Sequence, residues 1–247
     1  MPGLPDGITT FLFDLDGVLT QTAKVHAKAW KQMFDEFLRE WYARTGEPFR
    51  EFALRDDYER YVDGKQRRDG VRSFLQSRGI ELPEGSADDP PEAETIYGLG
   101  SRKNNLVLRL IHDEGVEAYP DAVVFVRQAR ERGLRRAVVS SSANAQEVLI
   151  AAGIADLFEA RIDGIVAERE HLAGKPAPDT FLAGARALGA EPAEAAVFED
   201  AEAGVQAGRA GSFGLVVGVD RTGHAQALRE HGADVVVRKL TELLERS

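Results

Sequence analysis

An acidic pair closes the first apolar segment of the chain. Asp14 and Asp16 stand in the sequence FDLDGV, one residue apart. Side chains at positions i and i+2 of an extended segment point to the same side, so the two carboxylates can share one site. Two carboxylates this close together repel each other unless a cation or a proton lies between them. Mg²⁺ suits such a site because it takes oxygen ligands and keeps waters that a phosphate can replace. The alternative is a plain turn, since Asp-Gly is a common turn pair.

Two further segments could bind anions. Ser140-Ser141-Ser142-Ala143-Asn144 offers hydroxyls, and backbone N–H groups where a helix is expected to begin. The alternative is a simple Ser or Asn helix cap. Lys175 lies in GKPAPD, between a glycine and two prolines. A lysine held in this way can neutralise a carboxylate and a phosphate together, although an isolated loop lysine is more often solvated.

A second acidic pair, Glu199-Asp200, follows another apolar run and is suited to holding a metal ion. The alternative is an acidic helix start that interacts favourably with the helix dipole. Each of the four segments is a weak signal by itself. Their common position, at the end of an apolar run, makes the combination informative.

Short apolar runs predict the strands that would position these segments. We predict strands over Ile8–Leu15, Arg135–Ser140, Ala195–Glu199, Gly214–Val219 and Ala233–Val237, with a shorter one near Ile162–Ile165. Ala-rich helical segments alternate with them, near residues 121–132, 143–152, 178–188, 203–210 and 224–231. Strands that alternate with helices predict a parallel sheet with helices on both faces and active residues at the carboxyl ends of the strands.

The stretch after the first strand is helical. Apolar residues from Val25 to Leu38 recur at helical spacing and predict a long helix over about Thr22–Ala43. No convincing strand follows between Arg44 and Asp113, and the run Leu82–Glu94 predicts a surface loop between helices. We therefore predict an α/β fold class: a Rossmann-like parallel sheet core, residues 1–22 and 114–247, with an inserted α-helical cap domain, residues 23–113.

The composition of the chain limits the kinds of partner that the protein can bind. The chain of 247 residues carries 31 Lys+Arg against 41 Asp+Glu, a formal net charge of -10, which disfavours non-specific binding to nucleic acid or anionic membranes. It has no cysteine, which excludes disulfides and thiolate chemistry. The start of the chain does not resemble a signal peptide, and no apolar run approaches about 18 residues. We expect a cytoplasmic monomer that binds neither nucleic acid nor membrane.

The order acid pair, hydroxyl, lysine, acid pair resembles the four motifs of the haloacid dehalogenase-like (HAD) superfamily. A closer resemblance, to the β-phosphoglucomutase-like family, is carried by FLFDLDGVLTQT with the following His26 and Trp30, and by SSSAN, GKPAPD and FEDAEAGVQA. In the cap it extends to Gly64 and Arg67 in DGKQRRDG, and to Lys103 and Asn104 in SRKNN. The chain departs from the family pattern at Gln21 and Asp63, where the family often has Asp and Lys.

The resemblance implies phosphoryl transfer through an aspartyl phosphate, with Mg²⁺ as cofactor and a sugar phosphate as substrate. Asp14 would be the nucleophile, Asp16 the general acid–base, and Lys175 the cation that neutralises charge. Ser140, together with Ser141, Ser142 and Asn144, would contact phosphate or sugar. The Asp14 and Asp200 carboxylates and the backbone carbonyl of Asp16 would hold Mg²⁺, with Glu199 close or ligating.

The resemblance also assigns roles in the cap. Arg67, with Gly64 beside it, would grip the phosphate distal to the metal, and Lys103 and Asn104 would reach the sugar. His26 would face the active site. For Trp30 the alternative is core packing, and for Arg67 a surface position. The remaining histidines, His112, His171, His224 and His231, are expected at the surface or in packing positions.

Three hypotheses follow. The first is a β-phosphoglucomutase that converts β-D-glucose 1-phosphate to glucose 6-phosphate through glucose 1,6-bisphosphate. The second is a sugar-phosphate phosphatase, which would share the nucleophile, metal and lysine and differ only in the cap. The third is a non-catalytic domain, which is disfavoured because such a domain would have lost Asp14, Asp16, Lys175 or Asp200.

Overall fold

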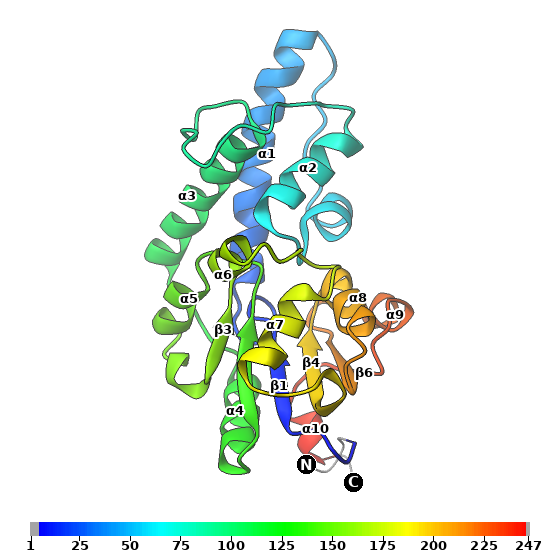
Figure 1. The fold of residues 1–247 in the computed structure, drawn as a ribbon. Helices are drawn as coiled ribbons and strands as arrows, with labels where there is room; N and C mark the ends of the chain where they lie inside the picture. The colour runs from blue at the N-terminus through cyan, green and yellow to red at the C-terminus, as the bar shows by residue number, and fades with distance from the viewer. Residues whose placement is uncertain (1–4, 246–247) are drawn as a thin grey trace. The chain divides into compact units, whose positions relative to one another are not determined.

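A computed structural model describes residues 5–245, which form two compact units (Figure 1). The described residues up to Thr22 and those from Val116 onward make up the core unit. Residues Ala23–Gly115, inserted between them in the chain, make up the cap unit.

The core unit contains a six-stranded parallel sheet, which confirms the predicted fold class. The strand order is β3-β2-β1-β4-β5-β6. The strands are β1 (Thr10–Phe13), β2 (Arg135–Val139), β3 (Ala160–Ile162), β4 (Ala195–Glu199), β5 (Leu215–Val219) and β6 (Val235–Val237). Phe13 of β1 is level with Val138 of β2 and with Phe198 of β4. The residues that follow these three strands therefore emerge side by side at one edge of the sheet.

Alternate residues of β1 pack on opposite faces of the sheet. On one face, Phe11 stacks 5.5 Å from Phe125, and Phe13 stacks 4.5 Å from Phe198, measured between ring centroids. On the other face, Leu12 belongs to an apolar cluster with side chains of α7 and α8. Since both faces are covered, every residue of β1 is buried, and the strand gives the residues after it a rigid base.

The helices of the core are α4 (Pro120–Glu131), α5 (Ala145–Ala151), α6 (Gly164–Arg169), α7 (Asp179–Ala187), α8 (Glu202–Ala210), α9 (Ala225–Glu230) and α10 (Glu242–Glu245). Short 3₁₀ turns lie at η2 (Ala155–Leu157) and η3 (Pro192–Glu194). The strand predicted near Ile162–Ile165 is misplaced, because β3 covers Ala160–Ile162 and shares only Ile162 with the prediction. Beyond Ile162, α6 begins, because the Asp163 carboxylate caps it by accepting the N–H groups of Ile165 and Val166, at 3.1 and 2.9 Å.

The cap unit is helical, and its described residues form no strand. It contains α1 (Ala23–Thr45), the π-helical turn η1 (Tyr58–Val62), α2 (Arg67–Ser77) and α3 (Ile96–Glu114). The ring of Phe34 on α1 lies 4.2 Å from that of Phe74 on α2 and 5.2 Å from that of Trp30, between centroids. The predicted loop over residues 82–94 lies between α2 and α3 and contains no helix or strand. In residues 5–245, no helix is both long and apolar enough to cross a membrane.

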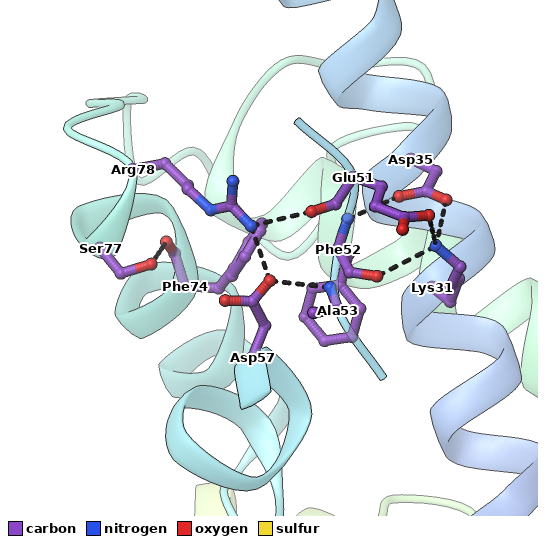
Figure 2. Close-up of polar contacts among 9 residues, drawn as sticks. All are labelled: Lys31, Asp35, Glu51, Phe52, Ala53, Asp57, Phe74, Ser77 and Arg78. Atoms are coloured by element: carbon purple, nitrogen blue, oxygen red, sulfur yellow. Dashed lines mark hydrogen bonds and ion pairs between the residues drawn. The ribbon is translucent and has the colours of Figure 1, made fainter. Parts of the chain in front are cut away.

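A polar network holds the segment between α1 and η1 against the cap helices (Figure 2). Lys31 on α1 donates to the carboxylates of Asp35 and Glu51, at 2.8 and 2.7 Å, and to the Phe52 carbonyl, at 3.0 Å. The Asp35 carboxylate in turn accepts the N–H of Phe52, at 2.8 Å. Burial alone would lower the pKa of Lys31, but the two carboxylates outweigh it and raise that pKa. These contacts keep the buried Phe52 ring in the cap core.

A second part of the network reaches α2. The guanidinium of Arg78 donates to the Glu51 carbonyl at 2.9 Å and pairs with the Asp57 carboxylate at 2.6 Å (Figure 2). The same Asp57 oxygen accepts the N–H of Ala53 at 2.8 Å. The segment therefore has a defined path although it contains no regular element.

Candidate active site

At the ends of three strands, two carboxylates and a backbone carbonyl contact the ammonium of one lysine. The Lys175 ammonium donates to Asp14 Oδ1 at 2.5 Å, to Glu199 Oε1 at 2.6 Å, and to the Val139 carbonyl at 3.2 Å. Asp14 follows β1, Glu199 ends β4, and Val139 ends β2. All three charged side chains are buried, so this is an ion-pair cluster with little solvent screening.

The charges in this cluster do not balance without a further cation. Burial raises the pKa of Asp14, the Lys175 ammonium lowers it in part, and the carboxylates of Glu199 and Asp16 raise it again, so that it stands well above its ordinary value. Burial alone would lower the pKa of Lys175, but its two carboxylate partners outweigh it and hold that pKa above the usual range. Lys175 therefore stays protonated, and additional positive charge nearby would lower the pKa of Asp14.

Asp14, Glu199 and Asp200 form a group that fits a divalent ion. One carboxylate oxygen from each lies within 4.8 Å of those of the other two. The donors are all carboxylate oxygens, and Mg²⁺ prefers oxygen ligands. These residues therefore fit the magnesium cofactor of the family described below.

Two glycines make room for the acidic residues. A Cβ atom placed on Gly17 would lie 1.8 Å from Asp200 Oδ2, and one placed on Gly204 would lie 1.7 Å from Glu199 Oε1. Gly17 also has a φ of +88°, which favours glycine. The carboxylates of Glu199 and Asp200 can approach only because neither position carries a side chain.

Asp16 is half-buried and lies in the loop after β1. Its carboxylate accepts a hydrogen bond from the Thr22 hydroxyl, and the Thr22 and Thr20 hydroxyl oxygens are 2.7 Å apart. Thr20 also pairs with Ala118, so the two connections of the core to the cap run side by side at this point. The loop that carries Asp16 is thus fixed to the core residues that precede the inserted segment.

The serine loop follows β2. Ser140 is buried, and its Oγ accepts the N–H of Ser142 at 3.1 Å, while the Ser142 Oγ accepts the N–H of Asn144 at 3.2 Å. Ser141 and Asn144 are half-buried in the same loop. The Asn144 side chain does not cap α5, so the simple-cap alternative is wrong for this residue. Neighbouring hydroxyls and a backbone turned by them are suited to contacting phosphoryl oxygens.

The cap unit gathers its predicted residues on facing helices. The buried Lys103 ammonium of α3 lies 2.9 Å from Nδ1 of His26 on α1 and 4.9 Å from the centroid of the Trp30 ring. The Arg67 side chain, at the start of α2, lies against Gly100 of α3, where a Cβ atom would be 3.5 Å from its Nε. Asn104 follows Lys103 on α3 and is half-buried.

Gly64 is in the turn before α2, with a φ of +68°. Trp30 packs in the cap core, which confirms the alternative prediction for this residue, and its ring also contacts Lys103.

Sequence reasoning missed two side chains of the core site. His224, expected at the surface or in packing, places Nε2 2.8 Å from the carbonyl oxygen of Asp200. Arg221 donates to the carbonyls of Gly17 and Val18 at 3.3 and 3.2 Å. Both follow β5, and their partners are backbone atoms far away in the chain. No spacing or motif in the sequence signals such contacts.

Comparisons with known proteins identify the family of this chain. Residues 8–211 match the model of the haloacid dehalogenase-like hydrolases. A β-phosphoglucomutase of Mycobacterium bovis is 56% identical over 98% of this chain and 94% of its own length. One of Bacillus subtilis is 32% identical over 94% of this chain and 90% of its own. The solved β-phosphoglucomutase of Clostridium difficile superposes with a TM-score of 0.74 at 25% identity, over 96% of this chain and 93% of that one.

The six-stranded parallel sheet, with two acidic pairs and a lysine brought together near its carboxyl edge, has the arrangement that the resemblance to the haloacid dehalogenase-like superfamily implies. The chain belongs to the haloacid dehalogenase-like family, in its β-phosphoglucomutase-like branch.

Proposed function

We propose that this protein is a Mg²⁺-dependent phosphosugar mutase that converts β-D-glucose 1-phosphate to glucose 6-phosphate. The observation that carries the proposal is the 56% identity to a β-phosphoglucomutase, because it runs through the cap unit as well as the core. A phosphatase could share the core motifs, so the similarity of the cap favours the mutase.

In the proposed cycle the enzyme starts phosphorylated on Asp14. The 6-hydroxyl of β-glucose 1-phosphate attacks the phosphorus of the aspartyl phosphate, and the bond from phosphorus to Asp14 breaks. Asp16 takes the proton of that hydroxyl as general base. The product of this half-reaction is β-glucose 1,6-bisphosphate.

The bisphosphate then turns round, and the second half-reaction runs in the opposite sense. A carboxylate oxygen of Asp14 attacks the phosphorus at C1, and the bond from phosphorus to the sugar oxygen breaks. Asp16 returns its proton to that leaving oxygen. Glucose 6-phosphate leaves, and Asp14 is phosphorylated again.

The buried cluster around Lys175 supports these assignments. Its ammonium touches Asp14 at 2.5 Å, so it stands where negative charge would collect on the transferring phosphoryl group. The carboxylates of Asp14, Glu199 and Asp200 and the backbone carbonyl of Asp16 would hold Mg²⁺, which supplies further charge stabilisation when bound. Ser140 and its loop would bind the remaining phosphoryl oxygens.

The cap residues would bind the end of the substrate that lies away from the metal. A sugar bisphosphate always has one phosphate away from the metal, so a second cation is required. We assign that role to Arg67, whose fork suits bidentate phosphate contact, with Gly64 shaping the turn before it. Lys103, Asn104 and His26 would contact the sugar. Residues 23–113 would act as the cap that excludes water from the aspartyl phosphate.

A product assay tests the proposal. The purified protein is given MgCl₂, β-glucose 1-phosphate and a trace of glucose 1,6-bisphosphate, and glucose 6-phosphate and free phosphate are followed together. We expect glucose 6-phosphate with little free phosphate. Free phosphate as the main product would make the protein a sugar-phosphate phosphatase, and no turnover of either kind would leave only a binding role. α-Glucose 1-phosphate serves as the control for the anomer.

Two variants test the residue assignments. Asp14→Asn should abolish turnover, and activity near that of the wild type would remove Asp14 as the nucleophile. Arg67→Ala should reduce mutase turnover far more than hydrolysis of a small phosphate ester, whereas the exposed Arg60→Ala should affect neither. Equal losses of both activities in Arg67→Ala would mean that Arg67 has a structural role.

A further inference from the structure

The loop after β5, residues Asp220–His224, contacts both acidic loops of the core site. Its Arg221 side chain is only 10% exposed. Nε donates to the carbonyl of Gly17 at 3.3 Å and Nη2 to that of Val18 at 3.2 Å. These carbonyls belong to the loop that carries Asp14 and Asp16. One guanidinium therefore grips the backbone directly beside the first acidic pair.

Other contacts keep that guanidinium in place. Nη1 donates to the Arg238 carbonyl at 2.8 Å and to Asp121 Oδ1 at 3.1 Å. The guanidinium also stacks on the Tyr119 ring, 3.9 Å from its centroid. Asp121 is held in turn, because its other oxygen accepts the N–H of Leu240 at 2.7 Å. Arg221 is a fixed donor and not a mobile surface side chain.

His224 contacts the second acidic loop, which carries Glu199 and Asp200. Its Nε2 lies 2.8 Å from the Asp200 carbonyl oxygen. A carbonyl can only accept a hydrogen bond, so Nε2 carries a hydrogen and donates it. Nδ1 lies 2.6 Å from the Thr222 hydroxyl, within the same loop. The imidazole therefore connects the loop after β5 to the backbone of a residue of the metal cluster.

Asp220 makes the loop rigid. Its Oδ1 accepts the N–H groups of Gly223 and His224, at 2.6 and 2.9 Å, and its own N–H donates to the Val237 carbonyl at 2.8 Å. Burial alone would raise the pKa of Asp220, but these hydrogen bonds outweigh it, so that pKa lies below its ordinary value. A rigid loop can set the distance between the two acidic loops that it holds.

The two acidic loops also touch each other directly. The α-carbon of Gly17 is so close to the Asp200 carboxylate that a Cβ atom there would lie 1.8 Å from Oδ2. Arg221 holds the Gly17 carbonyl, Gly17 packs on Asp200, and His224 holds the Asp200 carbonyl. A shift at either hydrogen bond therefore moves a carboxylate of the metal cluster.

We propose that Arg221 and His224 are positioning residues, which set the spacing of Asp14 and Asp200 for Mg²⁺ by fixing the backbones of the two acidic loops. This inference rests on the proposed magnesium site. Arginine is needed because its planar fork reaches three carbonyls and a carboxylate while it stacks on an aromatic ring, and lysine cannot do this. Residues that orient metal ligands typically change metal affinity by about 10–100-fold when they are lost.

The test measures Mg²⁺ binding to the full chain without substrate. Titration calorimetry with MgCl₂ alone, and thermal unfolding at rising MgCl₂, are carried out for Arg221→Ala and His224→Ala. We expect each variant to bind Mg²⁺ at least about 10-fold more weakly. The KM for the phosphate ester, measured at saturating Mg²⁺, should stay close to that of the wild type.

Two conservative variants and two controls sharpen the result. His224→Gln keeps a side-chain N–H donor and should recover part of the affinity, whereas Arg221→Lys should not, because it loses the fork. Arg130→Ala and His171→Ala remove an arginine and an exposed histidine of the same unit that do not contact the acidic loops, and should bind Mg²⁺ as the wild type does.

The outcomes separate this inference from the proposed function. If the wild type binds no Mg²⁺, the proposed metal site itself is wrong, and the inference is overturned with it. If the wild type binds and both alanine variants bind equally well, the inference is overturned whatever their melting temperatures. Should an alanine variant fail to fold, Arg221→Lys and His224→Gln decide: wild-type affinity in Arg221→Lys, or no difference between the two, overturns the proposal.

Discussion

Gly204→Ala should damage the active site although alanine is the better helix former. Gly204 lies in the first turn of α8, and its substitution adds one methyl group. In an ordinary helix interior that change stabilises a protein by about 0.5–1 kcal/mol. Here the new Cβ would lie 1.7 Å from Oε1 and 1.9 Å from Cδ of Glu199. The two groups cannot occupy these positions together.

The cost follows from what holds Glu199. Its carboxylate is fully buried and accepts from Lys175 at 2.6 Å and from the N–H of Ala201 at 2.8 Å. If Glu199 rotates away, both hydrogen bonds to a charged group are lost, at about 1.5–3 kcal/mol each. The gain in helix propensity offsets about 1 kcal/mol of this loss. We therefore expect Gly204→Ala to lower the free energy of unfolding by about 2–5 kcal/mol.

Urea unfolding and an activity assay measure the two consequences. The midpoint should fall for Gly204→Ala, and the Mg²⁺ concentration for half-maximal activity should rise, because Glu199 belongs to the carboxylate cluster. Gly100→Ala is the matched control. It also adds a methyl group inside a helix, but its Cβ would meet Arg67 at an ordinary 3.5 Å, so it should be neutral or slightly stabilising.

One result would refute this reasoning. If Gly204→Ala were as stable as Gly100→Ala and kept the wild-type dependence on Mg²⁺, the close approach of α8 to Glu199 would have no energetic importance. A loss of stability with unchanged Mg²⁺ dependence would retain the packing argument and remove the link to the metal cluster.

Three further predictions concern buried charges. Lys175→Met should reduce turnover by about 10²–10³-fold, the scale of one strong electrostatic contact, with retained folding checked by circular dichroism; turnover within 10-fold of wild type would contradict the assigned role. Asp220→Asn should destabilise the protein at pH 7. Because the pKa of Asp220 is lower in the folded protein, its ionised carboxylate stabilises the fold, and this contribution is lost as the pH falls through the folded pKa. The difference in urea midpoint between the variant and the wild type should vanish over that pH range, and a pH-independent difference would contradict this. Asp57→Asn should lower the free energy of unfolding by about 1–3 kcal/mol by weakening the pair with Arg78, and Arg78→Met alone should cost no less; a neutral Asp57→Asn would mean that the pair is solvent-screened.

The sequence predicted the parts of the fold that depend on local patterns. Short apolar runs located five of the strands within about two residues at each end. The strand near Ile162–Ile165 was placed too late in the chain, because Asp163 acts as a helix cap, β3 ends at Ile162, and the apolar residues after Asp163 belong to α6. A short apolar run can be either element, so here the capping residue decides.

Part of the candidate site could be predicted, because its charged residues stand in recognisable motifs of the sequence. Asp14 and Glu199 were expected to converge because strand ends of one parallel sheet meet at one edge, and the structure places their carboxylates 2.5 and 2.6 Å from the Lys175 ammonium. The expectation that Lys175 also stands at a strand end was wrong, because it lies in the loop between α6 and α7. Gly204 and Arg221 were not predicted. Their importance depends on how closely two backbones approach, and that distance is a property of the packed fold.

The buried cluster also explains why this site should depend on a divalent ion. Asp14, Glu199 and Asp200 place three carboxylates together against the single ammonium of Lys175, and burial leaves little water to screen them. A proton on Asp14 would relieve the repulsion, and its raised pKa shows this tendency, but a protonated carboxyl cannot attack phosphorus. A bound divalent cation relieves the same repulsion and leaves Asp14 ionised. The packing that holds these carboxylates together would therefore make Asp14, the proposed nucleophile, depend on the metal.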